Sequence, residues 1–200
     1  MSRELVLLFS AVFMVFISCS GEEISKNSDE DPFVIVLSPA HGGEDTGAIN
    51  DSGSVEKDLA LLLADCIKNN CRGNGIKVEL LRTEDVEMSS ADRLEKLSEM
   101  NADLLLSIHT DSSSDPSYRG IRIFHRKGDS SGMKLCSALE SKLAAIEAVN
   151  DVSYGEAGFR LLEESPVPAV VVEFGNINSS EDMKLVNSAE GRKEIGSAVF

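Results

Sequence analysis

The chain has 200 residues, of which 42% are hydrophobic and 26% are charged, and its formal net charge is −15 at pH 7. A charge of this sign and size argues against nucleic acid and against an anionic membrane surface as partners. An anionic substrate would have to be held by local contacts, because the overall field of the protein repels it.

Residues 1–19 have the features of a lipoprotein-type signal segment. Arg3 supplies a positive charge, and the apolar stretch after it, Leu5–Ile17, is too short to span a bilayer comfortably. The stretch closes on a small residue, Ser18, directly before Cys19, which resembles the lipobox of bacterial lipoproteins. We therefore expect a lipid on Cys19, with ordinary signal cleavage or an uncleaved anchor as the alternatives.

Residues 20–32 are polar and acidic, which predicts a flexible tether. The residues after it, 33–200, have the length of one domain. The cysteines of this domain form no Cys-X-X-Cys pair, so a zinc site made of cysteines is not expected. Cys66 and Cys71 could pair in an oxidising compartment or remain free thiols.

The first part of this domain alternates between the two kinds of secondary structure. The short apolar run Phe33–Ser38 predicts a buried strand. Apolar residues at helical spacing follow and predict a helix that Ser54 can cap. Ile76–Leu81 then predicts a second strand, and Ser90 can cap the helix after it.

The second part of the domain continues the alternation. Asp103–Ile108 predicts a buried strand, and Gly120–Phe124 predicts a more exposed strand near the edge of the sheet. Apolar residues over 133–146 share one helical face. Phe159–Leu162 predicts a short strand, and Ala169–Glu173 is a fully apolar strand that closes on a carboxylate.

Helical segments from about Ser180 complete the pattern. Strands that alternate with helices predict the α/β class: a single domain with a mostly parallel twisted sheet and helices on both faces. In such a sheet, ligands and active sites collect at the carboxyl ends of the strands.

Two histidines lie where that edge is expected. His41 follows the first strand and opens a Gly-Gly turn, and His109 follows the third strand. Glu56 lies in the first turn of the helix after His41, close enough to reach the same point. A catalytic zinc takes three protein ligands and keeps one position open, and two His plus one Glu is a common set. The sequence therefore predicts a zinc (Zn2+) site made of His41, Glu56 and His109.

Hydrolysis at such a site needs a further carboxylate that moves protons between water and the leaving group. Glu173 ends a buried strand and should reach the same sheet edge, so it is the candidate for this role. By themselves these residues predict metal-assisted hydrolysis of an amide or an ester.

Two other conspicuous side chains have simpler interpretations. His125 follows an exposed strand and stands beside Arg126 and Lys127, so we expect it at the surface. Arg93 lies in a predicted helix, and we expect it to be a structural ion-pair partner, with a substrate clamp as the alternative.

Several motifs, in order and at similar spacing, resemble the Amidase_3 family of zinc-dependent N-acetylmuramoyl-L-alanine amidases, which cleave peptidoglycan. The matching segments are Ser38–Ala48, Val55–Asp58, Leu81–Glu84 with Arg93, Ala102–His109 and Pro168–Gly175. The resemblance implies that His41, Glu56 and His109 bind zinc and that Glu173 is catalytic. It also implies cleavage of the amide between N-acetylmuramic acid and the L-alanine of the stem peptide.

The chain departs from the family pattern at a few positions. Before the first histidine, Ser38 stands where the family usually has Asp, and Ala40 where it usually has Gly. No metal ligand and no catalytic residue is changed, so we expect these departures to affect substrate contacts. The short segment between His109 and Gly120 leaves no room for the long autoinhibitory helix of activator-controlled members.

We therefore expect a lipid-anchored zinc amidase in the cell envelope, facing the periplasm at the outer membrane. Its expected partners are peptidoglycan and, through the lipid, the membrane, with no nucleic acid; the oligomeric state stays open. One alternative is a zinc carboxypeptidase or deacetylase that acts on another small polar substrate. Another is a lipoprotein that binds the cell wall without catalysis.

Overall fold

The computed structural model describes residues 31–200 except 74 and 116. The expected signal segment, the lipid on Cys19 and nearly all of the tether lie outside the described residues. Among the residues that are described, every helix is too short or too polar to pass through a bilayer.

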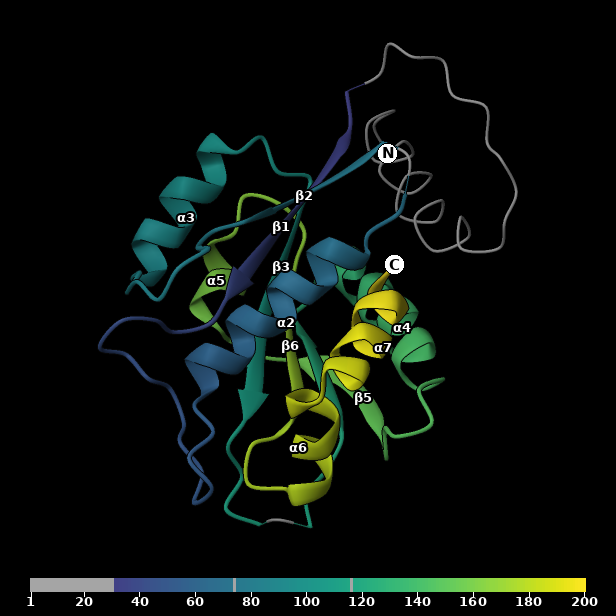
Figure 1. Ribbon diagram of the computed structural model, residues 1–200. Coiled ribbons are helices and arrows are strands. Elements are labelled where there is room, and N and C mark those ends of the chain that lie inside the picture. Colours follow the sequence, from purple (N-terminus) through teal and green to yellow (C-terminus); the bar gives the residue numbers. More distant parts are fainter. Residues whose placement is uncertain (1–30, 74, 116) are drawn as a thin grey trace.

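Six strands form one sheet in the order β2-β1-β3-β6-β4-β5 (Figure 1). The first four in this order run parallel, whereas β4 is antiparallel to β6 and parallel to β5. The strands are β1 Phe33–Pro39, β2 Ile76–Leu80, β3 Leu104–Asp111, β4 Ile121–His125, β5 Val152–Glu156 and β6 Ala169–Asn176. The predicted single α/β domain with a mostly parallel sheet is confirmed.

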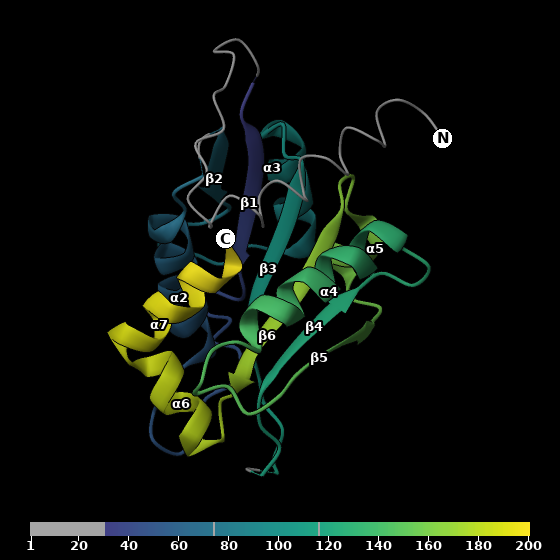
Figure 2. The same ribbon diagram turned by 90° about the vertical axis from the view of Figure 1, so that its right-hand side faces the viewer.

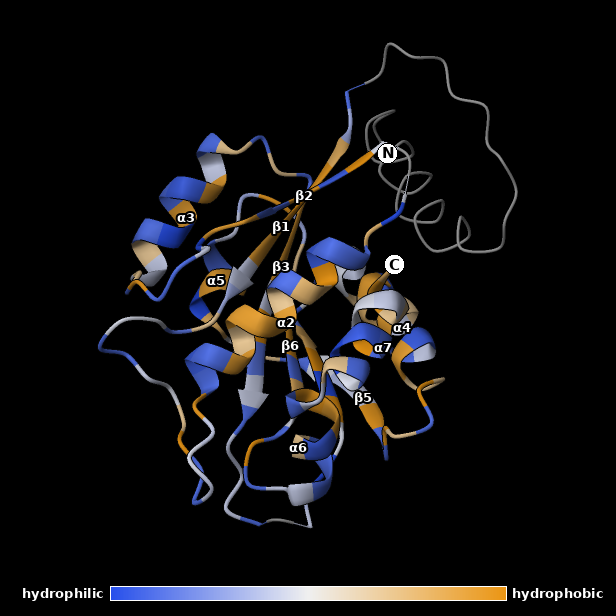
Figure 3. Ribbon diagram, viewed as in Figure 1, coloured by the Kyte–Doolittle hydropathy of each residue, from blue (hydrophilic) through white to orange (hydrophobic). Residues whose placement is uncertain are grey.

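Helices cover both faces of the sheet (Figures 1 and 2). They are α2 Glu56–Asn70, α3 Ser90–Glu99, α4 Ser130–Leu143, α5 Arg160–Glu164, α6 Ser180–Asn187 and α7 Ala189–Val199. Buried residues of α2, α4, α6 and α7 belong to the larger core on one face, and those of α3 and α5 to a smaller core on the other. The strands between them are the apolar ribbons at the centre of Figure 3.

The pleat of the strands divides the buried residues between the two cores. In β1, Ile35 and Leu37 belong to the larger core, and Val34 and Val36 belong to the smaller one. Successive side chains of a strand point to opposite faces, so Ser38 continues the face of the smaller core. In the same way β3 carries Leu105, Ser107 and His109 on that face, toward α3 and α5.

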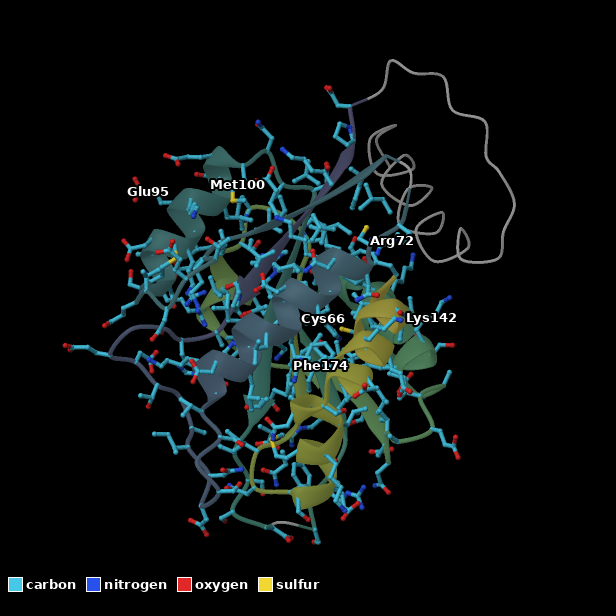
Figure 4. The ribbon with its side chains drawn as sticks, viewed as in Figure 1. Cys66, Arg72, Glu95, Met100, Lys142 and Phe174 are labelled. Carbon is cyan, nitrogen blue, oxygen red and sulfur yellow. The ribbon has the colours of Figure 1, made fainter. Side chains whose placement is uncertain are left out.

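The larger core is closed by tight packing of the last helix on α2. A Cβ at Gly196 of α7 would lie 3.0 Å from the Cys66 carbonyl oxygen of α2, so the absent side chain lets the two helices come close. Figure 4 labels Cys66 and Phe174, and the Phe174 ring of β6 is fully buried in this core. Cys66 and Cys71 are both free thiols.

Three local predictions are wrong. Phe159–Leu162 is not a strand: Phe159 precedes the short helix α5, whose residues Arg-Leu-Leu-Glu-Glu favour a helix. Ser89, not Ser90, caps α3, because Ser89 and Asp92 exchange hydrogen bonds in a capping box. Val55 rather than Ser54 occupies the cap position of α2, with no side-chain hydrogen bond.

The prediction that His125 lies at the surface is also wrong. Its side chain is 5% exposed. The β4 strand that carries it is not the edge of the sheet, because β5 pairs with its outer side. His125 Nδ1 lies 2.9 Å from the Arg126 carbonyl oxygen, so one ring nitrogen is satisfied by donating to the backbone.

Candidate metal centre and active site

The loop after β1 turns His41 over the edge of the sheet. The Ala40 N–H donates to the Ile108 carbonyl, which extends the pairing of β1 with β3 beyond the end of the strand. His41 then takes a positive φ of 54°, an uncommon conformation for a residue with a side chain. Gly42 follows with a φ of 131°, and a Cβ there would lie 2.1 Å from the Val86 carbonyl oxygen. The Gly-Gly turn is therefore required for this close approach to the neighbouring loop.

The three predicted ligands converge from three elements. His41 comes from the β1 loop, Glu56 from the first turn of α2 and His109 from β3. One potential ligand atom from each lies within 4.8 Å of the other two. The Glu56 oxygens lie 3.1 Å from His41 Nε2 and 3.2 Å from His109 Nδ1.

These separations fit a tetrahedral metal ion. With zinc bonds of about 2.0–2.1 Å, two ligand atoms of a tetrahedral site lie roughly 3.3 Å apart. The two carboxylate–imidazole distances are close to that value, although each runs to a different oxygen of Glu56, Oε2 toward His41 and Oε1 toward His109. A donor set of two imidazole nitrogens and a carboxylate is one that zinc takes. The structure thus brings His41, Glu56 and His109 together as the sequence predicted.

The electrostatics of the ligand set favour a cation. Burial would raise the pKa of the Glu56 carboxyl, but hydrogen bonds with His109, His41 and the Ala48 N–H outweigh it and hold the pKa well below its usual range. The hydrogen bond to Glu56 raises the pKa of His41 against the opposing effect of burial, and Asp45 adds to the rise. A cation that binds here would compete with the proton of His41.

Asp45 orients His41 from the side away from the metal position. Its Oδ2 lies 2.8 Å from His41 Nδ1, so that nitrogen donates and Nε2 is left to face Glu56. A carboxylate that holds the far nitrogen of a histidine is the common support of a metal-bound imidazole. Sequence analysis placed Asp45 inside a motif but assigned it no role; its spacing of four residues after a candidate ligand was the available signal.

Glu173 lies beside the metal ligands on the same face of the sheet. It pairs in register with His109 of β3 on one side and with Arg122 of β4 on the other. Neighbouring strands are about 4.8 Å apart and paired residues share a face, so these three side chains form one row. Glu173 therefore lies beside His109 as expected, although it does not end its strand, because β6 continues to Asn176.

Arg122 is a functional candidate that sequence analysis missed. Its Nη2 donates to Glu173 Oε2 over 2.9 Å and also forms an ion pair with Asp111. Its guanidinium lies over the Tyr118 ring, 4.2 Å from the centroid. Arg122 thereby fixes the position of the Glu173 carboxylate. Alternation along β4 was the only signal in the sequence, because it places Arg122 on the face opposite Ile121 and Ile123.

A cavity of about 180 Å³ opens beside the two histidine ligands. Ser38, Ser107 and Arg93 line it on the side of the sheet and α3, and Phe159 and Arg160 line it at α5. Among the described residues Arg93 does not form the expected ion pair: its hydrogen-bond partners are carbonyl oxygens and the Ser38 hydroxyl, not a carboxylate. Its hydrogen bond to the His41 carbonyl, 2.7 Å long, supports the loop that carries the first ligand.

Comparison with known proteins agrees with this geometry. The family model Amidase_3, described as N-acetylmuramoyl-L-alanine amidase, matches residues 35–200. Over 211 residues the chain is 28% identical to N-acetylmuramoyl-L-alanine amidase AmiA of Escherichia coli (strain K12). This alignment covers 83% of this chain and 73% of AmiA.

Solved structures of amidases share the fold. The N-acetylmuramoyl-L-alanine amidase from Clostridium difficile 630 superposes with a TM-score of 0.81 at 25% identity and covers 85% of this chain and 94% of that one. AmiC2 of Nostoc punctiforme gives a TM-score of 0.76 at 26% identity, with 84% and 92% covered. Since the family model spans most of the sequence, the chain belongs to the Amidase_3 family of N-acetylmuramoyl-L-alanine amidases, a family of hydrolytic enzymes.

Proposed function

We propose that the protein is a zinc-dependent hydrolase of peptidoglycan that cleaves the amide between N-acetylmuramic acid and the L-alanine of the stem peptide. The observation that carries the proposal is the convergence of His41, Glu56 and His109, whose potential ligand atoms lie within 4.8 Å of one another, with Glu173 in the next strand. The names of the related amidases support the choice of bond.

The residues of the chain divide the chemistry among them. His41, Glu56 and His109 would hold zinc. Bound zinc would act as a Lewis acid that polarises the scissile carbonyl and lowers the pKa of the attacking water. Glu173 accepts the proton of that water and passes it to the leaving amine. Arg122 keeps the Glu173 carboxylate oriented toward the same side of the sheet as His109.

Two glutamate variants separate these roles. Glu173→Gln keeps the shape of the side chain and removes its ability to accept a proton, so turnover should fall by about 10²–10⁴-fold while bound zinc persists. Glu56→Gln should weaken zinc itself, because a neutral amide is a poorer ligand than a carboxylate. The exposed Glu147 gives the matched control, and Glu147→Gln should change neither property.

The assay uses dye-labelled sacculi, mass analysis of the released products and elemental analysis of the protein. Free stem peptides that begin with L-alanine are the expected products. Peptides shortened from the carboxyl end would instead identify a carboxypeptidase, and binding without release would identify a cell-wall-binding protein. If Glu173→Gln loses the metal while Glu56→Gln retains it, the two glutamates have been assigned the wrong way round.

We also propose that the enzyme acts in the cell envelope, facing the periplasm at the outer membrane, through a lipid on Cys19. The support is the apolar run that closes on Ser18 before this cysteine. Cys19→Ser should leave an unprocessed or soluble precursor. A Cys19→Ser protein that fractionates and migrates like the wild type would refute lipidation.

A further inference from the structure

Two buried arginines next to the metal centre lack a carboxylate partner. Arg82 is 2% exposed and Arg93 is 4% exposed. Each makes four hydrogen bonds, and among the described residues all of these go to carbonyl oxygens or, once, to the Ser38 hydroxyl. A guanidinium has five N–H groups, so each arginine retains one donor. Buried positive charge without a counterion is costly, which makes this region a strong attractor for an anion.

Arg93 contacts a hydroxyl at a position where a carboxylate would neutralise it. The Ser38 hydroxyl oxygen accepts a 3.0 Å hydrogen bond from Arg93 Nη1. An aspartate there would place a carboxylate against this guanidinium. Serine supplies the hydrogen bond but no negative charge. The charge of Arg93 can therefore be neutralised by an anion that binds from solution.

An open space adjoins this unneutralised charge. The 180 Å³ cavity is lined by both Ser38 and Arg93 and by the histidine ligands His41 and His109. Ser107, which also lines the cavity, pairs in register with Ser38, and its hydroxyl is buried and has no hydrogen-bond partner. A buried hydroxyl of this kind normally has a partner, so the cavity offers an unused donor beside the arginine.

The acidic groups near the cavity do not cancel its charge. Asp45 lines the cavity but is hydrogen-bonded to His41. Arg160 also lines it, and its own partner is the exposed Glu164. Asp45 acts electrostatically on Arg93, and Asp58 and Asp85 act on Arg82, but among the described residues none of these carboxylates forms an ion pair with either arginine.

We propose that this cavity is a subsite for a carboxylate of the substrate, carried by the second residue of the stem peptide, counted from the L-alanine at the scissile amide. Arg93 and the hydroxyls of Ser38 and Ser107 would hold the carboxylate. The volume suits a group the size of one amino-acid residue, since a cavity of about 150 Å³ holds a benzene molecule. The cavity shares the walls His41 and His109 with the candidate metal site, and a second residue lies roughly two residues, about 7 Å of extended chain, from the scissile carbonyl.

The proposal rests on the proposed function for the identity of the substrate, and it adds a reason for selectivity. With a net charge of −15 the protein as a whole repels an acidic peptide. A local site with charge-assisted hydrogen bonds is what binds such a group against that field. The donors of the subsite would distinguish a free carboxylate from its carboxamide.

The test uses two muramoyl tripeptides that differ at one group. The second peptide residue carries either a free α-carboxylate or the corresponding carboxamide. For the wild-type enzyme, kcat/KM should be roughly 10- to 100-fold higher for the carboxylate, the usual worth of a hydrogen bond to a charged group. Equal values for the two substrates would overturn the proposal.

Ser38→Asp provides the decisive variant, because it gives Arg93 an internal carboxylate. The preference for the free carboxylate should fall to about 1 while zinc content is unchanged. Ser130→Asp adds the same charge at an exposed position at the start of α4 and should keep the wild-type preference. Ser107→Ala removes only a hydroxyl and should reduce the preference about 3- to 10-fold, so the test holds even if Ser38→Asp folds poorly.

A binding measurement separates this inference from the proposed activity. Calorimetry with the free peptides, acid and amide, needs no turnover. Tight binding of the acid peptide by the wild type, weakened at least tenfold in Ser38→Asp, supports the subsite even if neither tripeptide is cleaved. If the wild type and Ser38→Asp bind the acid peptide alike, the cavity holds water only and the inference is wrong.

Discussion

Replacing Gly47 by alanine should damage the metal centre without unfolding the protein. An alanine Cβ at this position would lie 2.5 Å from His41 Cδ2 and 2.7 Å from Glu56 Oε2. Carbon atoms rest against each other at about 3.5–4.0 Å, so the His41 ring would have to retreat by roughly 1 Å. The glycine thus keeps a space that two ligands occupy.

The cost divides into two parts, and Gly53 isolates one of them. Both glycines have positive φ, +62° at Gly47 and +86° at Gly53, but a Cβ at Gly53 meets nothing within 4 Å. Alanine at either position should lower the stability of the fold by about 1–2 kcal/mol, because a residue with a Cβ disfavours the left-handed backbone conformation. Only Gly47→Ala adds overpacking of about 1–3 kcal/mol.

The loss in metal affinity should exceed the loss in stability. Metal sites tolerate deviations of only about 0.2 Å in ligand distance, so a 1 Å displacement should weaken zinc binding by roughly 100-fold or more. Chelator competition measures this affinity, and thermal unfolding of the metal-free proteins measures stability. If Gly47→Ala binds zinc as tightly as Gly53→Ala, the steric argument is refuted.

Three further predictions concern the support of the site and the core. Asp45→Asn should lower zinc affinity about 10- to 100-fold, because the His41 ring loses its charged partner; unchanged affinity in chelator competition would show that Asp45 is incidental. In the metal-free protein the pKa of His41 is raised, mainly by Glu56, so a proton competes with zinc up to a higher pH than at an ordinary histidine. Zinc affinity should therefore rise from pH 6 to pH 8, and a flat profile would contradict this. Leu63→Ala, at a fully buried position of α2, should destabilise the fold by about 2–5 kcal/mol in denaturant unfolding, with little change in zinc affinity when folded.

The parts of the fold that could be predicted are the buried strands, because each is a run of consecutive apolar residues. The central strands are runs of Val, Ile and Leu, and a run such as Ala169–Glu173 has one plausible place in an α/β domain. The edge strand β5 has the sequence Val-Ser-Tyr-Gly-Glu, which lacks that signal, so it was missed. Because β5 was not predicted, β4 was expected near the edge of the sheet, and His125 was therefore wrongly expected at the surface.

The site could be predicted as far as its ligands and no further. Strand ends and a helix start determine where His41, Glu56 and His109 meet, and these follow from order along the chain. The contact between Arg122 and Glu173 depends on which strand pairs with β6 and on the direction of that strand. Strand pairing of this kind could not be read from the sequence. Arg93 donates to backbone carbonyl groups, and these contacts cannot be predicted from the types of the residues involved.

The wide separation of the proposed metal ligands along the chain would make metal supply a determinant of the folding equilibrium. Glu56 and His109 are 53 positions apart, and they meet only when α2 and β3 are packed together. An unfolded chain therefore offers no comparable site, and each bound ion favours the native state by mass action. At a free metal concentration 100 times the dissociation constant this linkage is worth about 2.7 kcal/mol. Chelation would withdraw that contribution from every part of the domain at once, so an organism that starves the enzyme of metal lowers its lifetime as well as its turnover.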